Sequence, residues 1–591
     1  MKKIYDAIII GSGAAAFSAA DWLYKAGVTD IALISENRLS GTSRNTGSDK
    51  QTYYKLSMDG FHQDSAYKMA SDMFGGGSCD GEKMYLQALN SSRCFLRLCD
   101  YGVGFPQDEF GGFPGYKTDH DSSVRATSVG PLTSKIMTEK LETVVLDKNK
   151  TPLFDGRQVV EILKKGNTAV GVTALNTNTD DFEEFYASNV ICATGAPACI
   201  YESSVYPESQ HGMTGVLIES GVKLCNFSQW QYGMASVDFR WNVSGSFMQV
   251  MPRFVSVDES GNEHEFLADC FLSTEEMLEN IFLKGYQWPF SYGRLTLSSR
   301  IDIAVHNETK KGRKVYLDYT ANPKGYSEQA LCAEAAEYLQ KNGAFGETPI
   351  KRLEKLNPKA IDLYKNNNID LYAEKLRIAV CAQHNNGGVH TDKNYETDIK
   401  GLYVIGEAAG TFGLARPGGS ALNDTQVGGL LCAKHIAAQK TQKTDVDGIC
   451  SSLGKTVADF ELDESIDYSL IKAKMSNSAS FIRNKEECTE LLEEIKTVIS
   501  AMPFRHKSLS AYFYDRDMLV SAKALLETVL GEMPLTGSRG GAVFTENGCA
   551  AEENIGYRDY VTVTDCGGVY FEKVSPVPLT DEPFEKYLKK V

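Results

Sequence analysis

The hydrophobic pattern at the start of the chain predicts a βαβ unit. Residues 4–10 form a mainly apolar run typical of a buried strand, and 14–26 carry apolar side chains at helical spacing. A second apolar run over 31–35 predicts the next strand. Residues 37–56 are polar and rich in Gly, Ser and Thr, which indicates a loop that contacts a ligand.

The same pattern divides the rest of the chain. Helices are predicted near 82–101 and 131–145, and paired strands over 170–175 and 184–191. From about 240 the sequence is dense in aromatic residues and lacks βα alternation, which returns at 374–440. The predicted division is a cofactor-binding domain in two parts (1–240 and 371–444), an inserted capping domain (241–370), and a C-terminal helical region with a tail (445–591).

A glycine-rich turn joins the first predicted strand to the first helix. Gly11 and Gly13 permit a tight turn and let the backbone approach a pyrophosphate, whose charge is stabilised at a helix N-terminus. Ala16 stands at the third position of the motif, and Glu36 ends the second strand, where an acid binds ribose hydroxyls. The turn predicts dinucleotide binding; a purely structural turn is the alternative.

Two later turns extend this prediction. Ala193-Thr194-Gly195 follows a predicted strand, either as a second cofactor contact or as an ordinary β-turn. In 401–424 a strand ends at Gly406-Glu407, and the glycine-rich turn that follows holds Arg416. An arginine beside a cofactor can bind a substrate carboxylate, with a structural ion pair as the alternative. Together the three turns predict a flavoenzyme.

The composition of the chain limits the kinds of molecule that it is expected to bind. The net charge of −16 over 591 residues argues against nucleic acid. The 14 cysteines show no CxxC or metal-ligand spacing, so we expect reduced thiols and no metal or iron–sulfur site in this chain. No apolar run approaches the roughly 20 residues that span a bilayer. The first strand begins near Ile4 and leaves no room for a signal peptide, so we expect a cytoplasmic protein without direct membrane insertion.

These motifs occur in an order that resembles the fumarate reductase/succinate dehydrogenase flavoprotein family, which includes L-aspartate oxidase and urocanate reductase. The resemblance covers most of the chain. It rests on GSGAAA (11–16), GTSRNTGSDKQ (41–51), the turn at 193–195, SSRIDIAVHNE (298–308), HNNGGVHTD (384–392), GLYVIGEAAG (401–410) and ARPGGSALND (415–424), with FIRN (481–484) and GSRGG (537–541) in the helical region.

The resemblance implies an α/β fold: a Rossmann-like FAD-binding domain with an inserted α+β capping domain and a C-terminal helical region. The implied cofactor is FAD. Residues of the motifs above are expected to bind it: Gly11, Gly13, Ala14, Ala15, Ser35, Glu36, Thr42, Ser43, Arg44, Asn45, Thr46, Ala193, Thr194, Gly195, Gly387, Gly388, Gly406, Glu407, Gly418, Ser420, Ala421 and Leu422.

The chain departs from the family at three positions. Asn45 stands where respiratory members carry the histidine that bonds covalently to FAD, so FAD is expected to be non-covalent. Gln383 stands where the family carries a substrate-binding histidine, and His384 follows one residue later. Phe412 stands where the family carries a second histidine, four residues before the arginine. These changes disfavour fumarate itself as the substrate.

Catalytic residues follow from the resemblance. Arg416 is expected to bind a substrate carboxylate, with His384 beside it. Arg253 lies in the region of the family's proton-donating arginine and is either an acid/base or substrate ligand or a structural residue. Tyr286 and Arg294 are its rivals in the capping domain.

The expected activity is FAD-dependent reduction of an activated C=C bond in a carboxylate-bearing small molecule, by hydride transfer from flavin N5. The alternatives are an oxidase or dehydrogenase of a carboxylic or amino acid, and a flavoprotein subunit that passes electrons to an iron–sulfur partner. No second glycine motif for NAD(P)H is present. The electron donor is therefore open, with a reduced flavin or an iron–sulfur protein among the candidates.

Overall fold

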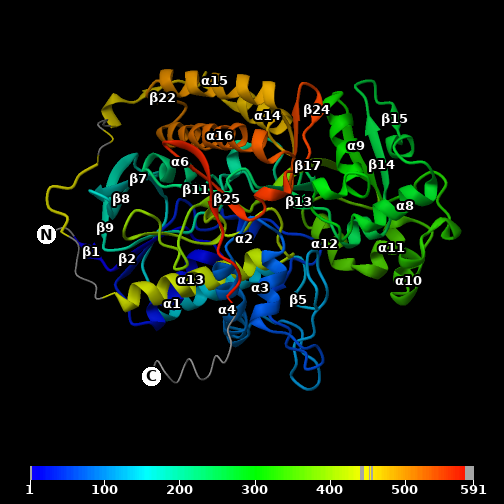
Figure 1. The fold of residues 1–591 in the computed structure, drawn as a ribbon, viewed down its shortest axis with the longest axis horizontal. Coiled ribbons are helices and arrows are strands. Elements are labelled where there is room, and N and C mark those ends of the chain that lie inside the picture. Colours follow the sequence, from blue (N-terminus) through cyan, green and yellow to red (C-terminus); the bar gives the residue numbers. More distant parts are fainter. Residues whose placement is uncertain (1–2, 440–444, 452, 454–456, 579–591) are drawn as a thin grey trace.

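The computed structural model describes residues 3–439, 445–451, 453 and 457–578 (Figure 1). Its central element is a parallel five-stranded sheet in the order β19-β10-β2-β3-β6. Its central strands are buried along their length, as their apolar runs require. The strands are β19 (Leu402–Val404), β10 (Val190–Cys192), β2 (Ala7–Ile10), β3 (Ile31–Ile34) and β6 (Leu153–Phe154).

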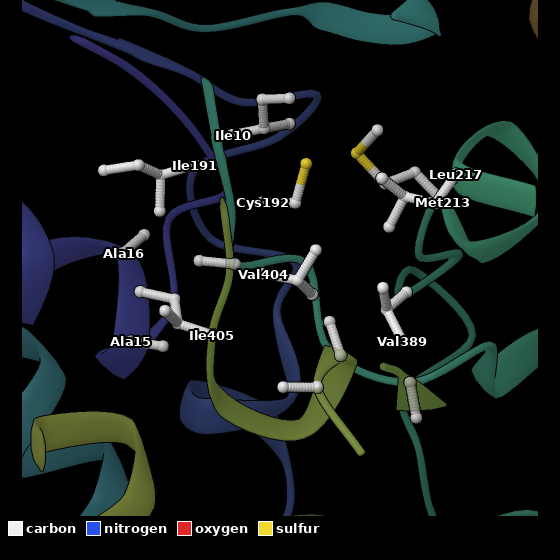
Figure 2. Close-up of a cluster of buried hydrophobic side chains, with 14 of the residues drawn as sticks. Ile10, Ala15, Ala16, Ile191, Cys192, Met213, Leu217, Val389, Val404 and Ile405 are labelled. Atoms are coloured by element: carbon white, nitrogen blue, oxygen red, sulfur yellow. The ribbon is translucent and has the colours of Figure 1, made fainter. Parts of the chain in front are cut away.

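Two helices that follow strands of this sheet pack against each other. They are α1 (Ala14–Lys25), which begins at the glycine-rich turn, and α13 (Ser420–Ala438), which follows the turn containing Arg416. Figure 2 shows side chains of α1, β2, β10 and the end of β19 meeting in one buried cluster, among them Ala15, Ile10, Ile191 and Val404. This packing brings together turns that lie about 400 residues apart in the sequence.

Two predicted strands are each divided in the structure. The run 4–10 splits at Asp6 into β1 (Ile4–Tyr5) and β2, and the run 184–191 splits into β9 (Asp181–Ala187) and β10. Each half joins a different sheet, and Asn189 Nδ2 fixes the two breaks together by donating to the Asp6 carbonyl at 2.9 Å. The second sheet has the order β1-β9-β8-β7, with β8 (Thr168–Asn176) and β7 (Arg157–Lys165).

The two early helix predictions are confirmed. The first is α4 (Gly81–Asp100), which begins where the Asp80 side chain accepts from Lys83 N. The second is α5 (Thr133–Glu142), which continues as a π-helical turn over Thr143–Lys148. Shorter elements between strands β3 and α4 are α2 (Thr42–Asn45), β4 (Tyr53–Tyr54) and α3 (Ala66–Phe74).

An antiparallel sheet with its own helices forms a cap beside the parallel sheet (green in Figure 1). A separate cluster of buried apolar side chains, drawn from Met234 to Ile378, forms its core. The strands are β13 (Trp241–Asn242), β12 (Trp230–Ser236), β17 (Leu376–Asn385), β16 (Lys314–Asp318), β14 (Arg253–Val257) and β15 (Glu263–His264). The helices are α7 (Ser246–Gln249), α8 (Thr274–Leu283), α9 (Ser299–Lys310), α10 (Ala333–Lys341), α11 (Pro349–Leu356) and α12 (Pro358–Lys365).

The C-terminal region is helical, as predicted, and buried hydrogen bonds join it to the segment that leads into β12. The Glu532 carboxylate accepts from Ser228 Oγ at 2.5 Å, Gln229 Nε2 at 2.7 Å and Arg539 Nη2 at 2.5 Å. All of these groups are buried. The elements are α14 (Ser469–Ser478), α15 (Lys485–Ala501), α16 (Leu509–Thr536), β23 (Val543–Glu546), β25 (Tyr560–Asp565) and β26 (Gly568–Lys573). Within the described ranges, no helix is long and apolar enough to cross a membrane.

We expect Arg539→Met to destabilise the fold strongly, because it leaves the buried Glu532 carboxylate without its cation. The loss expected for a broken buried pair is about 3–5 kcal/mol in the free energy of unfolding. Arg558→Met is the matched control, since Arg558 pairs with Glu553 at a half-exposed site and should cost about 0–1 kcal/mol. Urea denaturation followed by circular dichroism measures both, and equal losses would contradict the assigned role of Arg539.

Candidate active site

A cavity of about 1300 Å³ lies between the parallel sheet and the cap. This exceeds the roughly 300–1,000 Å³ of a pocket for one drug-sized ligand. The space therefore admits a large cofactor together with a second molecule. Its lining comes from the turn after β2, the loop 40–52, the segment 116–122, the cap segment 282–289 and the turn 416–422.

One end of the cavity is built around the N-terminus of α1. Gly13 is the N-cap and offers no side chain, and the first turn of the helix carries no acid. Gly11 has φ 120°, and a Cβ there would lie 2.5 Å from the Ala193 carbonyl oxygen. The backbone of the two turns thus meets at a distance that only glycine allows. The N-terminus of α1 lines the cavity, and its dipole favours an anion there.

Gln210 bridges the loop that contains Thr42 and the turn that contains Thr194, both at this end of the cavity. Its Oε1 accepts from Thr42 N at 3.2 Å, and its Nε2 donates to the Thr194 carbonyl at 2.6 Å. The hydroxyl oxygens of Thr42 and Thr194 are buried and lack a partner among the residues that the structure describes. Hydroxyls left in this state beside a helix N-terminus fit the phosphates of a dinucleotide.

Glu36 lines the same end, as an acid that binds ribose must. Its carboxylate accepts from the Tyr514 hydroxyl and lies 3.5 Å from His211 Nδ1. His211 in turn stacks on Tyr514, with ring centroids 3.7 Å apart. No local pattern pointed to Tyr514, because it comes from α16, far along the chain. His211 therefore belongs to the nucleotide end of the cavity.

Most of the residues expected to bind the cofactor line this cavity. They are Gly11, Gly13, Ala14, Ala15, Ser35, Glu36, Thr42, Ser43, Thr46, Ala193, Thr194, Gly195, Glu407, Gly418, Ala421 and Leu422. Ser43 also accepts from Ala14 N at 3.1 Å, in the first turn of α1.

Other expected cofactor residues lie outside the lining. Arg44 is buried against Glu142 at 2.9 Å. The exposed Asn45 donates to the carbonyls of Leu39 and Gly41 at 2.7 and 3.0 Å. Three of the remaining four are glycines that pack closely against a neighbouring residue: Gly387 against Asn226, Gly388 against Ala408, and Gly406 against Ala15. The fourth is Ser420, whose hydroxyl donates to the Pro417 carbonyl.

Arg416 lies toward the cap in the same cavity. Its Nη2 donates to Gln231 Oε1 at 2.7 Å, and its guanidinium lies 5.5 Å from the ring centre of Phe412. Among the described residues no carboxylate lies within ion-pair distance of it, and its Nε is buried without a partner. Burial lowers the pKa of Arg416 to about 10. A partly buried guanidinium without an anionic partner is well suited to bind an anion.

The neighbours of Arg416 are neutral or close to neutral. Burial, reinforced by the charge of Arg416, holds the pKa of His384 well below its ordinary value, so this imidazole is uncharged at neutral pH. Burial raises the pKa of Glu407 to about 7. Glu407 accepts from the Tyr206 hydroxyl and from Asn385 N at 3.0 Å.

A bulge brings several of these side chains together. On paired strands β12 and β17, Gln231 faces His384, and the register shifts between Gln231 and Tyr232. Consecutive residues of a regular strand point to opposite faces, yet Gln383 and His384 both line the cavity. The local irregularity accounts for this arrangement.

Of the three candidates that the sequence offered from the cap, two line the cavity and Arg253 does not. The Arg253 guanidinium bonds Asp318 at 2.6 Å, Glu265 at 3.2 Å and Glu263 at 3.5 Å. This cluster ties β14 to its neighbours and does not support the catalytic role expected of Arg253. The rivals do line the cavity: Arg294 pairs with Asp119 at 2.8 Å, and Tyr286 bonds Glu334 at 2.7 Å.

A dinucleotide cradle that continues to an arginine without a carboxylate partner among the described residues is the arrangement expected of a flavin-dependent enzyme with an anionic substrate. A family model described as an FAD binding domain matches residues 6–422. The chain belongs to this family, and it is an FAD-dependent oxidoreductase.

The curated relatives agree with this assignment. An uncharacterized FAD-dependent oxidoreductase of Methanocaldococcus jannaschii is 22% identical and aligns over 89% of this chain and 91% of its own. A fumarate reductase (CoM/CoB) chain of Methanothermobacter marburgensis is 24% identical over 84% and 85%. An L-aspartate oxidase of Yersinia pestis is 24% identical over 74% and 75%.

Solved structures share the fold. A quinol fumarate reductase chain of E. coli superposes with a TM-score of 0.71 at 18% identity, covering 99% of this chain and 98% of that one. Sdh1 of Mycobacterium smegmatis gives 0.73 at 16% identity, with 98% and 96% covered. The expected α/β architecture with cap and helical region is therefore confirmed.

We expect Gly11→Ala to weaken FAD binding by about 10- to 100-fold, because the new methyl group meets the Ala193 carbonyl and overpacks the cradle. Gly27→Ala is the control. Gly27 also has positive φ, at 88°, but no atom lies within 4 Å of the position that its methyl group would take, so it bears the backbone strain alone. Fluorescence titration of each apoprotein with FAD measures the Kd. Equal affinities of the two variants would contradict the close approach.

Proposed function

We propose that this FAD-dependent oxidoreductase reduces an activated C=C bond in a small molecule that carries a carboxylate. The observation that carries the proposal is Arg416, which is partly buried in the cavity beside the cofactor-binding turns and has no carboxylate within ion-pair distance among the described residues. A substrate carboxylate would supply the missing charge. The activities named for two relatives, an L-aspartate oxidase and a fumarate reductase, concern small carboxylates.

FAD, when bound, supplies the hydride at flavin N5. The chain's own residues bind and orient the substrate. The planar guanidinium of Arg416 can hold a carboxylate by two parallel hydrogen bonds, and it stabilises the negative charge that gathers there as the double bond accepts hydride. Gln231 fixes the orientation of Arg416 through its 2.7 Å contact. His384, uncharged, adds no competing cation.

The α carbon also needs a proton, which must come from a group near the cavity. Arg294 and Tyr286 line it from the cap and are the proposed proton-handling residues in place of Arg253. The proposed cofactor linkage is non-covalent, since Asn45 has no nucleophilic ring and its amide is bound to backbone carbonyls. The electron donor is proposed to be a separate molecule, a reduced flavin or an iron–sulfur protein.

A second candidate is the oxidation of an amino or carboxylic acid. It is favoured by the similarity to L-aspartate oxidases, since the same arginine would hold the substrate's carboxylate. The two candidates differ in the direction of electron flow. Anaerobic stopped-flow absorbance of dithionite-reduced enzyme, mixed with a panel of enoic acids or with O2, separates them. Rapid flavin reoxidation by an enoic acid supports the reductase; reoxidation by O2 alone supports the oxidase.

In that assay we expect Arg416→Lys to lower the second-order rate constant for reoxidation by roughly 100-fold or more, because an ammonium lacks the two-pronged grip and the delocalised charge of a guanidinium. FAD content should be unchanged. Arg377→Met is the control, since Arg377 is half exposed on β17 and pairs with Asp238. An Arg416→Lys enzyme that reacts as fast as the parent would exclude Arg416 as the carboxylate ligand.

The binding of an unreactive saturated carboxylate should weaken as pH rises from 6 to 8. Below its pKa of about 7, Glu407 is neutral and does not repel the carboxylate of the ligand bound at Arg416. Above that pKa, the negative charge of Glu407 repels the ligand and weakens its binding. The Kd, read from the flavin spectrum of the holoenzyme, should rise several-fold over this range and stay flat in Glu407→Gln. His384 does not titrate in this window, because its pKa lies well below 6.5. A slope that persists in the variant would assign the titration to another group.

A further inference from the structure

We propose that the substrate carries, besides the carboxylate held by Arg416, a neutral hydrogen-bond acceptor such as a carboxamide or another carbonyl, and that Gln383 recognises it. The inference rests on the proposed function and specifies its substrate class. Two observations support it: the fixed orientation of the Gln383 amide, and the distribution of charge around the cavity.

The amide of Gln383 is oriented by Trp288 of the cap. Trp288 Nε1 donates to Gln383 Oε1 at 2.7 Å. An indole N–H only donates, so the oxygen of the amide must face it and the nitrogen must face away. Gln383 lines the cavity, and its Nε2 is buried with no partner among the residues described. Such a donor costs stability unless a bound molecule supplies an acceptor.

Both side chains are held in place from behind. A Cβ at Gly233 of β12 would lie 2.6 Å from the Trp288 ring and 2.8 Å from Gln383 Nε2, so the pair occupies the space that this glycine leaves. The ring centre of Trp288 also lies 5.4 Å from Lys284 Nζ, which forms a buried ion pair with Asp302 at 2.5 Å. The position of the amide is thus set by the cap and by β12 together.

The charges around the cavity leave room for one substrate carboxylate. Arg294, the cap cation, is already paired with Asp119 at 2.8 Å. Lys50 and Lys117 also line the cavity, but both are exposed to solvent. Among the described residues that line the cavity near the cap, Arg416 is therefore the partly buried cation that has no carboxylate within ion-pair distance. A second carboxylate would be buried without compensation, whereas a neutral carbonyl needs only a donor.

The test compares fumarate with its monoamide, two substrates of the same shape that differ in charge, and with crotonate, which has no second polar group. Reduced enzyme is mixed with each, and the rate constant and apparent affinity for flavin reoxidation are measured separately. We expect the monoamide to be favoured over fumarate by at least about tenfold in kcat/KM. The amide oxygen of the monoamide pairs with the Gln383 donor, whereas the second carboxylate of fumarate would be buried without a cation. Binding of the saturated monoamide of succinate to oxidised enzyme should follow the same order.

Variants locate the effect. Gln383→Leu should lower kcat/KM for the monoamide by about tenfold or more and leave crotonate nearly unchanged. Trp288→Phe, which removes the donor that orients the amide, should reduce the preference for the monoamide over fumarate. Gln340→Leu, at an exposed position of α10, is the control.

The outcomes separate the two proposals. If fumarate reacts as well as the monoamide, or if Gln383→Leu slows crotonate as much as the monoamide, the role of Gln383 is refuted while the reductase assignment stands. If no carboxylate-bearing alkene reoxidises the flavin, the proposed function is refuted, and the substrate class inferred from it is refuted with it.

Discussion

The charge of Arg416, partly buried and without a carboxylate in ion-pair distance among the described residues, is the constraint around which this site is arranged. A partly desolvated guanidinium is costly unless its N–H groups are hydrogen-bonded, so the fold must hold it by neutral contacts until an anion arrives. Gln231 does this by a direct hydrogen bond, and the ring of Phe412 lies within cation–π distance. The same charge contributes to the low pKa of His384. The chemistry of the cavity therefore depends on how firmly Gln231 is placed.

Gln231 is placed by β12, and the C-terminal region fixes the start of that strand. Arg483 Nη2 donates to the Ser228 carbonyl at 2.7 Å and lies 3.3 Å from the Tyr232 hydroxyl. Glu532 holds the Ser228 side chain from α16. The helical region thus has a structural connection to the site on both flanks of Gln231, although it does not reach Arg416 itself. Tyr514 gives the same region a contact with Glu36 at the other end of the cavity.

The cap is joined to the cofactor-binding loop by a buried carboxylate. Asp49 accepts from Ser246 N at 2.9 Å and from its hydroxyl at 3.0 Å. Gly245 has φ 57°, and a Cβ there would lie 2.2 Å from Asp49 Oδ2, so the Asp49 carboxylate packs against a backbone position that only glycine fits. Burial raises the pKa of Asp49. This contact holds the loop at a fixed distance from the cap, and the loop and the cap both line the cavity.

The sequence alone predicted what is encoded locally. The apolar runs, the turn at Gly11 and Gly13 and the acid Glu36 each depend on neighbours within one βαβ unit, and the structure places them at the cavity. For Arg253 the sequence left a catalytic and a structural role open, because position along the chain does not show its partners, which are set by the pairing of β14 with β15 and β16. Tyr514 and Gln210 had no local signal, since each acts through a contact more than a hundred residues distant in sequence.

The side chains of Gln383 and Phe412 are compatible with one another in physical terms. Phe412 places an apolar ring by Arg416, which excludes water and strengthens the desolvation of its charge. A second charged ligand for substrate in this setting would repel Arg416 or neutralise it. A glutamine whose oxygen is bound to Trp288 does neither, because it contributes only a neutral donor. With Arg416 as the cation and Gln383 as a neutral donor, this wall matches the proposed substrate, which carries a single carboxylate and a polar, uncharged group.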